Sequence, residues 1–307
     1  MEQSQHTLSL IASDPERSQK IRVVVSDMDG SFLNGAGKVS KANREAVKRL
    51  QEAGLRFIVC TGRTFGEASL PLKEAGIACD MIAMNGAAIY GKDGKLKREH
   101  FLSMDKVRAV FQAVRDWQKE LILQLVTDQG EYIVAEEEVF RHFFLTRLFP
   151  GKDRTREEED LILKPYRRIM PEAFFRMELK CYKAVTLSED VDLIRQIEGR
   201  LKQIPEVCVA ASFSTNWEIT NKYASKGEGL TDYIRSLGCS LNQVMAFGDG
   251  DNDRTMLSLP LGWSVAMGNA SEGLKKAADM ITLSNEEDGF AEAADALLEA
   301  NRRRREQ

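Results

Sequence analysis

Short runs of apolar, often β-branched residues alternate along the first part of the chain with segments whose apolar side chains recur every three or four positions. The runs at 21–26, 55–60 and 80–84 are typical of buried strands. The segments at 41–53 and 61–74 are typical of helices, the first with Ser40 as its N-cap and Gly54 as its stop. Strands and helices that alternate at this spacing predict a doubly wound parallel sheet.

The pattern changes near residue 89. The turn sequence Lys92-Asp93-Gly94 predicts a hairpin, which a parallel sheet does not use. Segments of mixed type follow: helices at 103–117, from 136 and at 188–201, strands at 121–126, 131–134, 177–187, 207–209 and 217–219, and a charged loop or helix start at 152–160. This order is typical of a separate α+β unit with antiparallel strands.

From Lys226 the first pattern returns, with a helix that ends near Gly238 and a buried strand at 244–247. We therefore predict an α/β fold in which a doubly wound, Rossmann-like core at 20–88 and 222–307 is interrupted by an inserted α+β cap domain at 89–221. Residues 1–19 are predicted to be a polar tail that takes no part in the fold. The arginine run at 302–305 is predicted to end a helix.

The charge balance argues against a nucleic acid or an anionic membrane as partner, because 43 basic and 47 acidic residues leave a net charge of −4. The five cysteines form no C-x-x-C pair and the three histidines are far apart, so we expect reduced thiols and no zinc site. Neither a secretion signal nor an apolar stretch of the ~18 residues that a membrane span needs is visible. We expect a cytoplasmic protein, and the sequence does not predict its oligomeric state.

Two carboxylates follow the first predicted strand, in Asp27-Met28-Asp29-Gly30-Ser31. Side chains two residues apart on an extended chain project to the same side, so Asp27 and Asp29 should point the same way. Open α/β sheets bind their ligands at the carboxyl ends of parallel strands. Aspartate and glycine are also common in ordinary turns, so this motif by itself leaves both interpretations open.

A second acidic cluster, Gly248-Asp249-Gly250-Asp251-Asn252-Asp253, follows the predicted strand at 244–247. Carboxylates this close repel one another unless a cation intervenes, and oxygen ligands without histidine or cysteine favour Mg²⁺ over zinc. A calcium-binding EF-hand is the competing interpretation. The sequence disfavours it, because Arg254 stands where that loop needs glycine and Pro260 where it needs glutamate.

Two further motifs place polar groups at predicted helix starts. Thr61-Gly62-Arg63 follows the second strand, where a hydroxyl and exposed backbone N–H groups can seat an anion, although threonine is also a common N-cap. Ser225-Lys226-Gly227 opens another helix, and a lysine there opposes the helix dipole unless an anion accompanies it. An ordinary surface lysine is the simpler alternative. Each of these two motifs is weak when taken alone.

Together the four motifs resemble those of the haloacid dehalogenase-like hydrolase superfamily, specifically its Cof-type phosphatase branch with an inserted C2-type cap. The family pattern is D-x-D-G-T, then T-G-R, then S-K-G, then G-D-x-x-N-D. Asn85-Gly86-Ala87 is also similar to the N-G-A that precedes the cap in this branch. The resemblance covers about residues 20–295. Ser31 departs from the usual threonine but keeps a hydroxyl.

The resemblance implies a role for each matching residue. Asp27 would be the nucleophile that forms an aspartyl-phosphate, and Asp29 would protonate the leaving oxygen and then activate water. Mg²⁺ would be held by the carboxylates of Asp27 and Asp249 and the backbone carbonyl of Asp29, with Asp253 positioning the metal's waters or the lysine. The other matching residues would bind the phosphate or offset its charge: Thr61, Gly62, Arg63, Lys226 and Asn252.

We therefore predict a Mg²⁺-dependent phosphomonoesterase that hydrolyses a small phosphorylated metabolite, such as a sugar phosphate, with the cap selecting the leaving group. Lys183, Arg63 and the segment 212–216 are weaker candidates for substrate contacts. Two alternatives remain open: a phosphotransferase or phosphomutase on the same fold, and a non-catalytic protein that binds a phosphate ligand. Asp29 argues against the second, because a binding protein has no need of an acid there.

Overall fold

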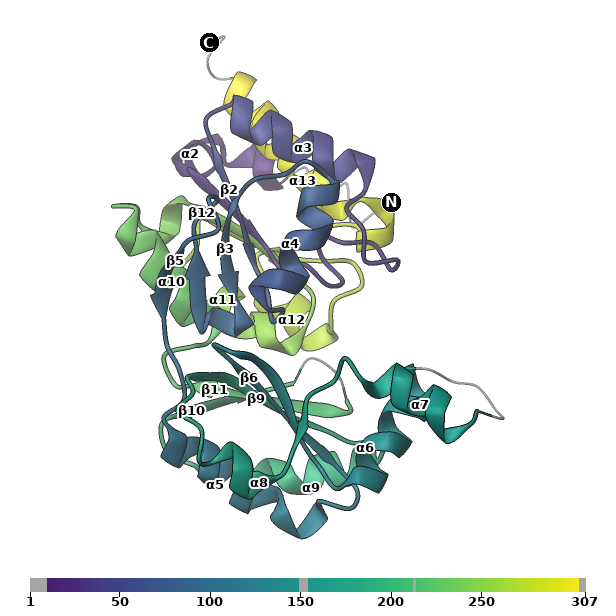
Figure 1. Cartoon of the computed structure of the whole chain (residues 1–307). Coiled ribbons are helices and arrows are strands. Elements are labelled where there is room, and N and C mark those ends of the chain that lie inside the picture. Colours follow the sequence, from purple (N-terminus) through teal and green to yellow (C-terminus); the bar gives the residue numbers. More distant parts are fainter. Residues whose placement is uncertain (1–9, 149–153, 212–213, 304–307) are drawn as a thin grey trace. The chain divides into compact units, whose positions relative to one another are not determined.

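The structure is a computed structural model that describes residues 10–148, 154–211 and 214–303. These residues form two compact units (Figure 1). The core unit contains the described residues up to Glu99 and from Tyr223 onward, and the cap unit contains those from His100 to Lys222.

Eight strands of the described residues form one sheet in the core unit, in the order β14-β13-β12-β1-β2-β3-β4-β5. The strands from β14 to β3 are parallel, whereas β4 and β5 are antiparallel. Ser26 of β1 lies opposite Phe247 of β12. The bounds are β1 Val23–Ser26, β2 Arg56–Cys60, β3 Asp80–Ala83, β4 Ala88–Tyr90, β5 Leu96–Glu99, β12 Val244–Gly248, β13 Trp263–Ala266 and β14 Met280–Ile281.

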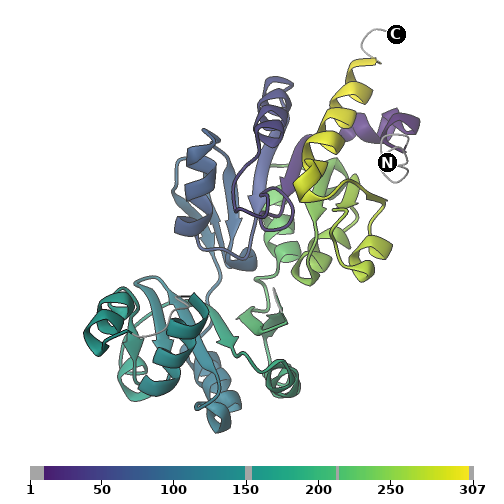
Figure 2. The ribbon, with the colours of Figure 1, turned by 90° about the vertical axis from the view of Figure 1, so that its right-hand side faces the viewer.

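Helices cover both faces of this sheet, so the predicted doubly wound α/β core is confirmed (Figure 1). One face carries α3 (Lys41–Glu52), α4 (Phe65–Glu74) and α13 (Gly289–Arg303), and the other carries α10 (Lys226–Ser236) and α11 (Arg254–Leu257), with α12 (Glu272–Ala277) following β13. Helix α13 packs beside α3 although the two are far apart in sequence (Figure 2). Because both faces are covered, the central strands are apolar on both sides, as in Val23-Val24-Val25.

Helix α4 begins later than predicted, at Phe65 instead of Thr61. Its N-cap is Thr64, whose hydroxyl accepts the Glu67 N–H while the Glu67 carboxylate accepts the Thr64 N–H. This reciprocal capping box fixes the helix start. Thr61-Gly62-Arg63 therefore lies in the loop between β2 and α4, directly before the N-cap.

The hairpin of β4 and β5 belongs to the core unit, which corrects the predicted boundary at residue 89. Strand β4 pairs with β3, so the parallel sheet continues into an antiparallel edge. The cap unit begins at His100. The turn signal predicted the hairpin, but a turn does not encode which sheet its strands will join.

The predicted polar tail is wrong for residues 10–19. Residues Pro15–Lys20 form helix α2, with Asp14 as its N-cap. The side chains of Ile11 and Ser18 are fully buried, and the guanidinium of Arg17 lies over the Trp263 ring, 3.8 Å from its centroid. A few buried contacts therefore hold this segment on the core unit. Its polar composition gave no indication of them.

Six strands of the described residues form the cap sheet, in the order β10-β11-β9-β6-β7-β8. Helices α5 (Met104–Val114), α8 (Pro171–Phe174) and α9 (Val191–Leu201) share its larger apolar core, and α6 (Glu137–Phe143) and α7 (Arg156–Leu163) share a smaller one. The predicted α+β insertion is confirmed. The strand bounds are β6 Ile122–Thr127, β7 Gly130–Val134, β8 Arg168–Ile169, β9 Cys181–Leu187, β10 Val207–Ala210 and β11 Asn216–Asn221.

All five cysteines are free thiols. Within the described ranges, the structure contains no helix whose length and apolar character would let it cross a membrane. The arginine run continues α13 as far as Arg303, and its last two residues lie outside the described part of the chain.

Candidate active site

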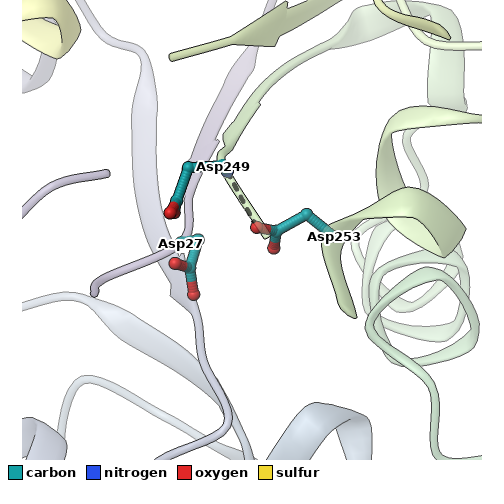
Figure 3. Close-up of side chains that lie close together, drawn as sticks. All are labelled: Asp27, Asp249 and Asp253. Atoms are coloured by element: carbon teal, nitrogen blue, oxygen red, sulfur yellow. Dashed lines mark hydrogen bonds between the residues drawn. The ribbon is translucent and has the colours of Figure 1, made fainter. Parts of the chain in front are cut away.

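Two neighbouring parallel strands bring the two acidic motifs together. Asp27 directly follows β1 and Asp249 directly follows β12, and the Asp27 N–H donates to the Phe247 carbonyl at 3.0 Å. Parallel neighbours end at the same edge of a sheet, so residues more than two hundred positions apart meet there. Figure 3 shows Asp27 and Asp249 side by side, with Asp253 facing them.

The carboxylates of Asp27, Asp249 and Asp253 form a compact cluster. One oxygen from each lies within 4.8 Å of the others. Asp27 is 5% exposed and Asp253 is completely buried. The oxygens of Asp253 are already engaged, because one accepts the backbone N–H groups of Asp249 (2.9 Å) and Gly250 (3.0 Å). Asp253 therefore shapes the loop, while Asp27 and Asp249 keep more acceptor capacity for a ligand.

Lys226 supplies a buried positive charge to this cluster. It is the first residue of α10, and its ammonium donates to Asp27 at 2.5 Å and to the second Asp253 oxygen at 2.7 Å. Its side chain is fully buried. These carboxylates explain why a lysine is tolerated at a helix start, where the dipole disfavours it.

The electrostatics of the cluster favour an added cation. Burial raises the pKa of Asp27 well above its ordinary value, against the opposing charge of Lys226, and the neighbouring carboxylates raise it further. Burial and the charge of Asp253 raise the pKa of Asp249 to about 6. Burial disfavours the Lys226 ammonium, but the charges of Asp253 and Asp27 outweigh it and raise the lysine pKa. With all four groups ionised, the cluster carries more negative than positive charge.

The donor set fits a hard divalent cation. The clustered groups are carboxylates, and the three acidic side chains converge on one small volume. Burial is the main cause of the two raised aspartate pKa values, and a divalent ion would offset the charge excess that adds to it. The backbone at Gly30 lies very close to the Asp249 side chain. The φ of Gly30 is +78°, and a Cβ there would stand 2.2 Å from an Asp249 oxygen. Only glycine allows the loop to bring the two motifs this close.

Asp29 does not join the carboxylate cluster. Its side chain forms a bidentate ion pair with Arg63, with N–O distances of 2.7 and 2.5 Å. The Arg63 side chain is 27% exposed and that of Asp29 is 52% exposed. The structure thus pairs two predicted site residues with each other.

The remaining core motif residues surround the same strand ends. Thr61 is buried, its hydroxyl accepts the Arg63 N–H at 3.1 Å, and Gly62 lies between them. The Asn252 amide donates to the Asn85 side chain at 3.4 Å. The predicted helix-end anion seat at Thr61 is corrected, because the chain reaches α4 only at Phe65. Any anion here would meet loop groups instead.

The weaker cap candidates lie in the other unit. Lys183 of β9 forms a buried ion pair with Glu218 of β11 at 2.9 Å. Within the candidate segment 212–216, Asn216 is buried, whereas residues 212 and 213 lie outside the described residues.

Sequence reasoning missed one group that orients the cluster. The Ser31 hydroxyl donates to an Asp249 oxygen at 2.9 Å, linking the first acidic motif to the second. The sequence showed Ser31 only as a substitute for the usual threonine. A hydroxyl directly after Asp-Gly was the available signal, but its partner is 218 residues away.

Comparison with known proteins identifies the family of the chain. A sequence model of the haloacid dehalogenase-like hydrolases matches residues 24–293. The chain belongs to this family. It is therefore an enzyme of the haloacid dehalogenase-like hydrolase family, and it has the inserted cap of the Cof-type branch.

Three relatives illustrate the similarity. Phosphatase YwpJ of Bacillus subtilis is 27% identical over 91% of this chain and 100% of its own length. The 5-amino-6-(5-phospho-D-ribitylamino)uracil phosphatase YwtE of the same organism is also 27% identical, over 91% of this chain and 98% of its own. A solved haloacid dehalogenase-like hydrolase from B. subtilis has the same fold, with a TM-score of 0.76, 23% identity and coverage of 90% and 99%.

Proposed function

We propose that this chain is a Mg²⁺-dependent phosphomonoesterase that acts through an aspartyl-phosphate on Asp27. The observation that carries the proposal is the placement of the Asp27 carboxylate, which lies beside the buried Lys226 ammonium and within reach of Asp249. A carboxylate in contact with a cation can approach an anionic phosphate that would otherwise repel it.

In the first half of the reaction, an Asp27 oxygen attacks phosphorus and the bond to the leaving oxygen breaks. The leaving oxygen takes a proton from Asp29 and departs as an alcohol. In the second half, Asp29 takes a proton from water, which attacks phosphorus and releases Asp27 and inorganic phosphate. Because the structure pairs Asp29 with Arg63, the Asp29 carboxyl group must leave Arg63 to serve as the acid.

The carboxylates of Asp27 and Asp249 and the backbone carbonyl of Asp29 are the proposed Mg²⁺ ligands, with Asp253 acting through water molecules. Bound Mg²⁺ supplies charge stabilisation for the phosphoryl oxygens. Lys226 holds Asp27 from the other side and neutralises part of the cluster. Thr61, Gly62, Arg63 and Asn252 are the proposed phosphate contacts, since they lie around the same strand ends.

The proposed substrate class is a small phosphorylated metabolite that carries a sugar or sugar-alcohol chain. The name of one relative supports this class, because its substrate is a phosphorylated ribityl compound. Within this class, we predict that the cap unit selects the leaving group.

The test measures phosphate release from a panel of sugar, polyol and aryl phosphates with Mg²⁺, with EDTA, and with EDTA followed by excess Mg²⁺. We expect turnover that EDTA stops and Mg²⁺ restores. Isomerised sugar phosphate with little free phosphate would replace the hydrolase by a phosphomutase. No turnover of any compound would favour a protein that only binds phosphate ligands.

A further inference from the structure

A second group of charged residues lies at the amino ends of the parallel strands, on the opposite side of the core sheet from the strand ends that carry the candidate active site. Asp80 is the first residue of β3, and its side chain is 7% exposed. Its carboxylate accepts the Tyr233 hydroxyl and the Lys92 backbone N–H, the latter at 2.7 Å. It also contacts Lys97 and Arg56, each at 3.3 Å. None of these groups belongs to the four motifs.

Tyr233 connects this group to the candidate active site through α10. The helix begins with Lys226, and Tyr233 follows seven residues later, so both lie on the same face about two turns, or ~10 Å, apart. Tyr233 is 2% exposed. A second contact ties the same part of the helix to β5, because Arg98 pairs with Asp232 at 2.9 Å.

The other end of α10 lies close against the strand ends. A Cβ on Gly229 would stand 2.8 Å from the Gly86 Cα and 2.9 Å from an Ile82 methyl group. The helix is thus pressed onto the sheet near Lys226 and hydrogen-bonded to the sheet at Tyr233. Close packing holds the helix against the sheet near Lys226, and the hydrogen bond at Tyr233 is a directional contact that depends on both distance and angle.

We propose that Asp80 and Tyr233 are positioning residues for Lys226: their hydrogen bond fixes the axial position of α10 and so holds the ammonium between Asp27 and Asp253. This inference rests on the proposed function. The ammonium contacts both carboxylates at short distances inside a buried site, so a small shift of the helix changes the geometry of both contacts. Misplacing a reacting group by ~1 Å can slow catalysis by up to ~100-fold.

The test compares Tyr233→Phe, Asp80→Asn and Asp80→Ala with the wild type, using p-nitrophenyl phosphate at saturating Mg²⁺. We expect kcat to fall by about tenfold in Tyr233→Phe and Asp80→Ala, with KM unchanged within about twofold. Asp80→Asn should lose less, because the amide oxygen still accepts the tyrosine hydroxyl. Asp279→Ala is the matched control: it removes a carboxylate that accepts the Ser264 N–H and hydroxyl, both at 2.9 Å, and the Arg17 guanidinium.

Thermal unfolding and hydrogen exchange of the α10 amides accompany the kinetics. A purely structural role would lower Tm in the Asp80 variants as in the control and leave kcat unchanged, and that result overturns the proposal. If the wild type hydrolyses nothing, the proposed function fails. The hydrogen-exchange rates of the α10 amides then test by themselves whether the Asp80–Tyr233 hydrogen bond positions the helix. Faster exchange of residues 226–230 in Tyr233→Phe, but not in Asp279→Ala, supports it, and equal exchange rejects it.

Discussion

Asp27 and Asp80 are two aspartates of one sheet, the first at the carboxyl end of β1 and the second at the amino end of β3. They are almost equally buried, at 5% and 6% exposed. Burial raises the pKa of both carboxyl groups. At Asp27 the carboxylates of Asp253 and Asp249 add to that effect, and the pKa ends well above its ordinary value. At Asp80 the hydrogen bonds from Tyr233 and the Lys92 N–H, with the charge of Lys97, outweigh burial, and the pKa ends below its ordinary value.

The opposite pKa shifts distinguish Asp80, whose charge is balanced by groups of the protein, from Asp27, whose charge is balanced only in part. Donors and cations surround Asp80, so its ionised form stabilises the fold above about pH 4 and loses this contribution as the pH falls. Asp27 shares one ammonium with Asp253 and has Asp249 nearby, so its ionised form costs folding free energy until a cation arrives. The ionised carboxylate of Asp80 therefore stabilises the fold, whereas that of Asp27 favours the binding of a cation.

The largest expected effect is that of Asp27→Asn. We expect kcat to fall by at least about a thousandfold, because an amide is a poor nucleophile. Without metal, the Tm should equal or exceed that of the wild type, since a carboxyl group with a raised pKa has been removed. Asp80→Asn should instead lower the Tm. Turnover within tenfold of the wild type would remove Asp27 as the nucleophile.

Lys226→Met should cause the next largest change. It leaves the buried Asp27 and Asp253 without their shared ammonium, which costs about 3–5 kcal/mol of unfolding free energy in EDTA. The matched change at the other edge is Lys97→Met, where Asp80 keeps Tyr233, Arg56 and the Lys92 N–H. Since Lys97 is half exposed, we expect a loss below about 1 kcal/mol. Equal losses in urea unfolding would contradict the difference between the two edges.

The stabilisation by Mg²⁺ should depend on pH. The pKa of Asp249 is raised to about 6, so its protonated form stabilises the metal-free fold below about pH 4, and this contribution is lost as the pH rises through 6. Mg²⁺ binds the ionised form, and at a hundred times its Kd a ligand adds about 2.7 kcal/mol. We therefore expect a larger Mg²⁺-induced rise in Tm at pH 7.5 than at pH 5.

Asp249→Asn is the control for this pH dependence. The variant lacks the titrating carboxyl group, so the difference in Mg²⁺ response between pH 5 and pH 7.5 should shrink. A response of the wild type that is independent of pH would mean that protons and Mg²⁺ do not compete at this cluster.

The smallest expected effect is that of Ser31→Ala. The variant loses the hydrogen bond to Asp249, worth about 1 kcal/mol, and we expect roughly fivefold weaker activation by Mg²⁺ with little change in Tm. Ser31→Thr keeps the hydroxyl and should behave as the wild type does. If both variants titrate alike with Mg²⁺, Ser31 does not orient Asp249.

Much of the core was predictable because its signals are local. Three buried runs and the Ser40 cap predicted β1, β2, β3 and α3. The errors came where a short signal had several structural outcomes. The capping box at Thr64 and Glu67 moved the start of α4, the β4–β5 hairpin joined the core sheet, and Ile11 anchored a segment that looks polar.

The sequence by itself determined which groups stand at the ends of which strands, because strand periodicity and helix caps depend on neighbouring residues. It thereby placed Asp27 and Asp249 at one edge of the sheet. Lys226 was predicted only at the start of a helix, and the resemblance to the family joined it to the same site. Only the tertiary structure decided their partners: Lys226 lies between Asp27 and Asp253, Asp29 pairs with Arg63, and Ser31 reaches Asp249. Side-chain pairing and pKa values depend on distances across the fold, and those follow from packing between segments far apart in the chain.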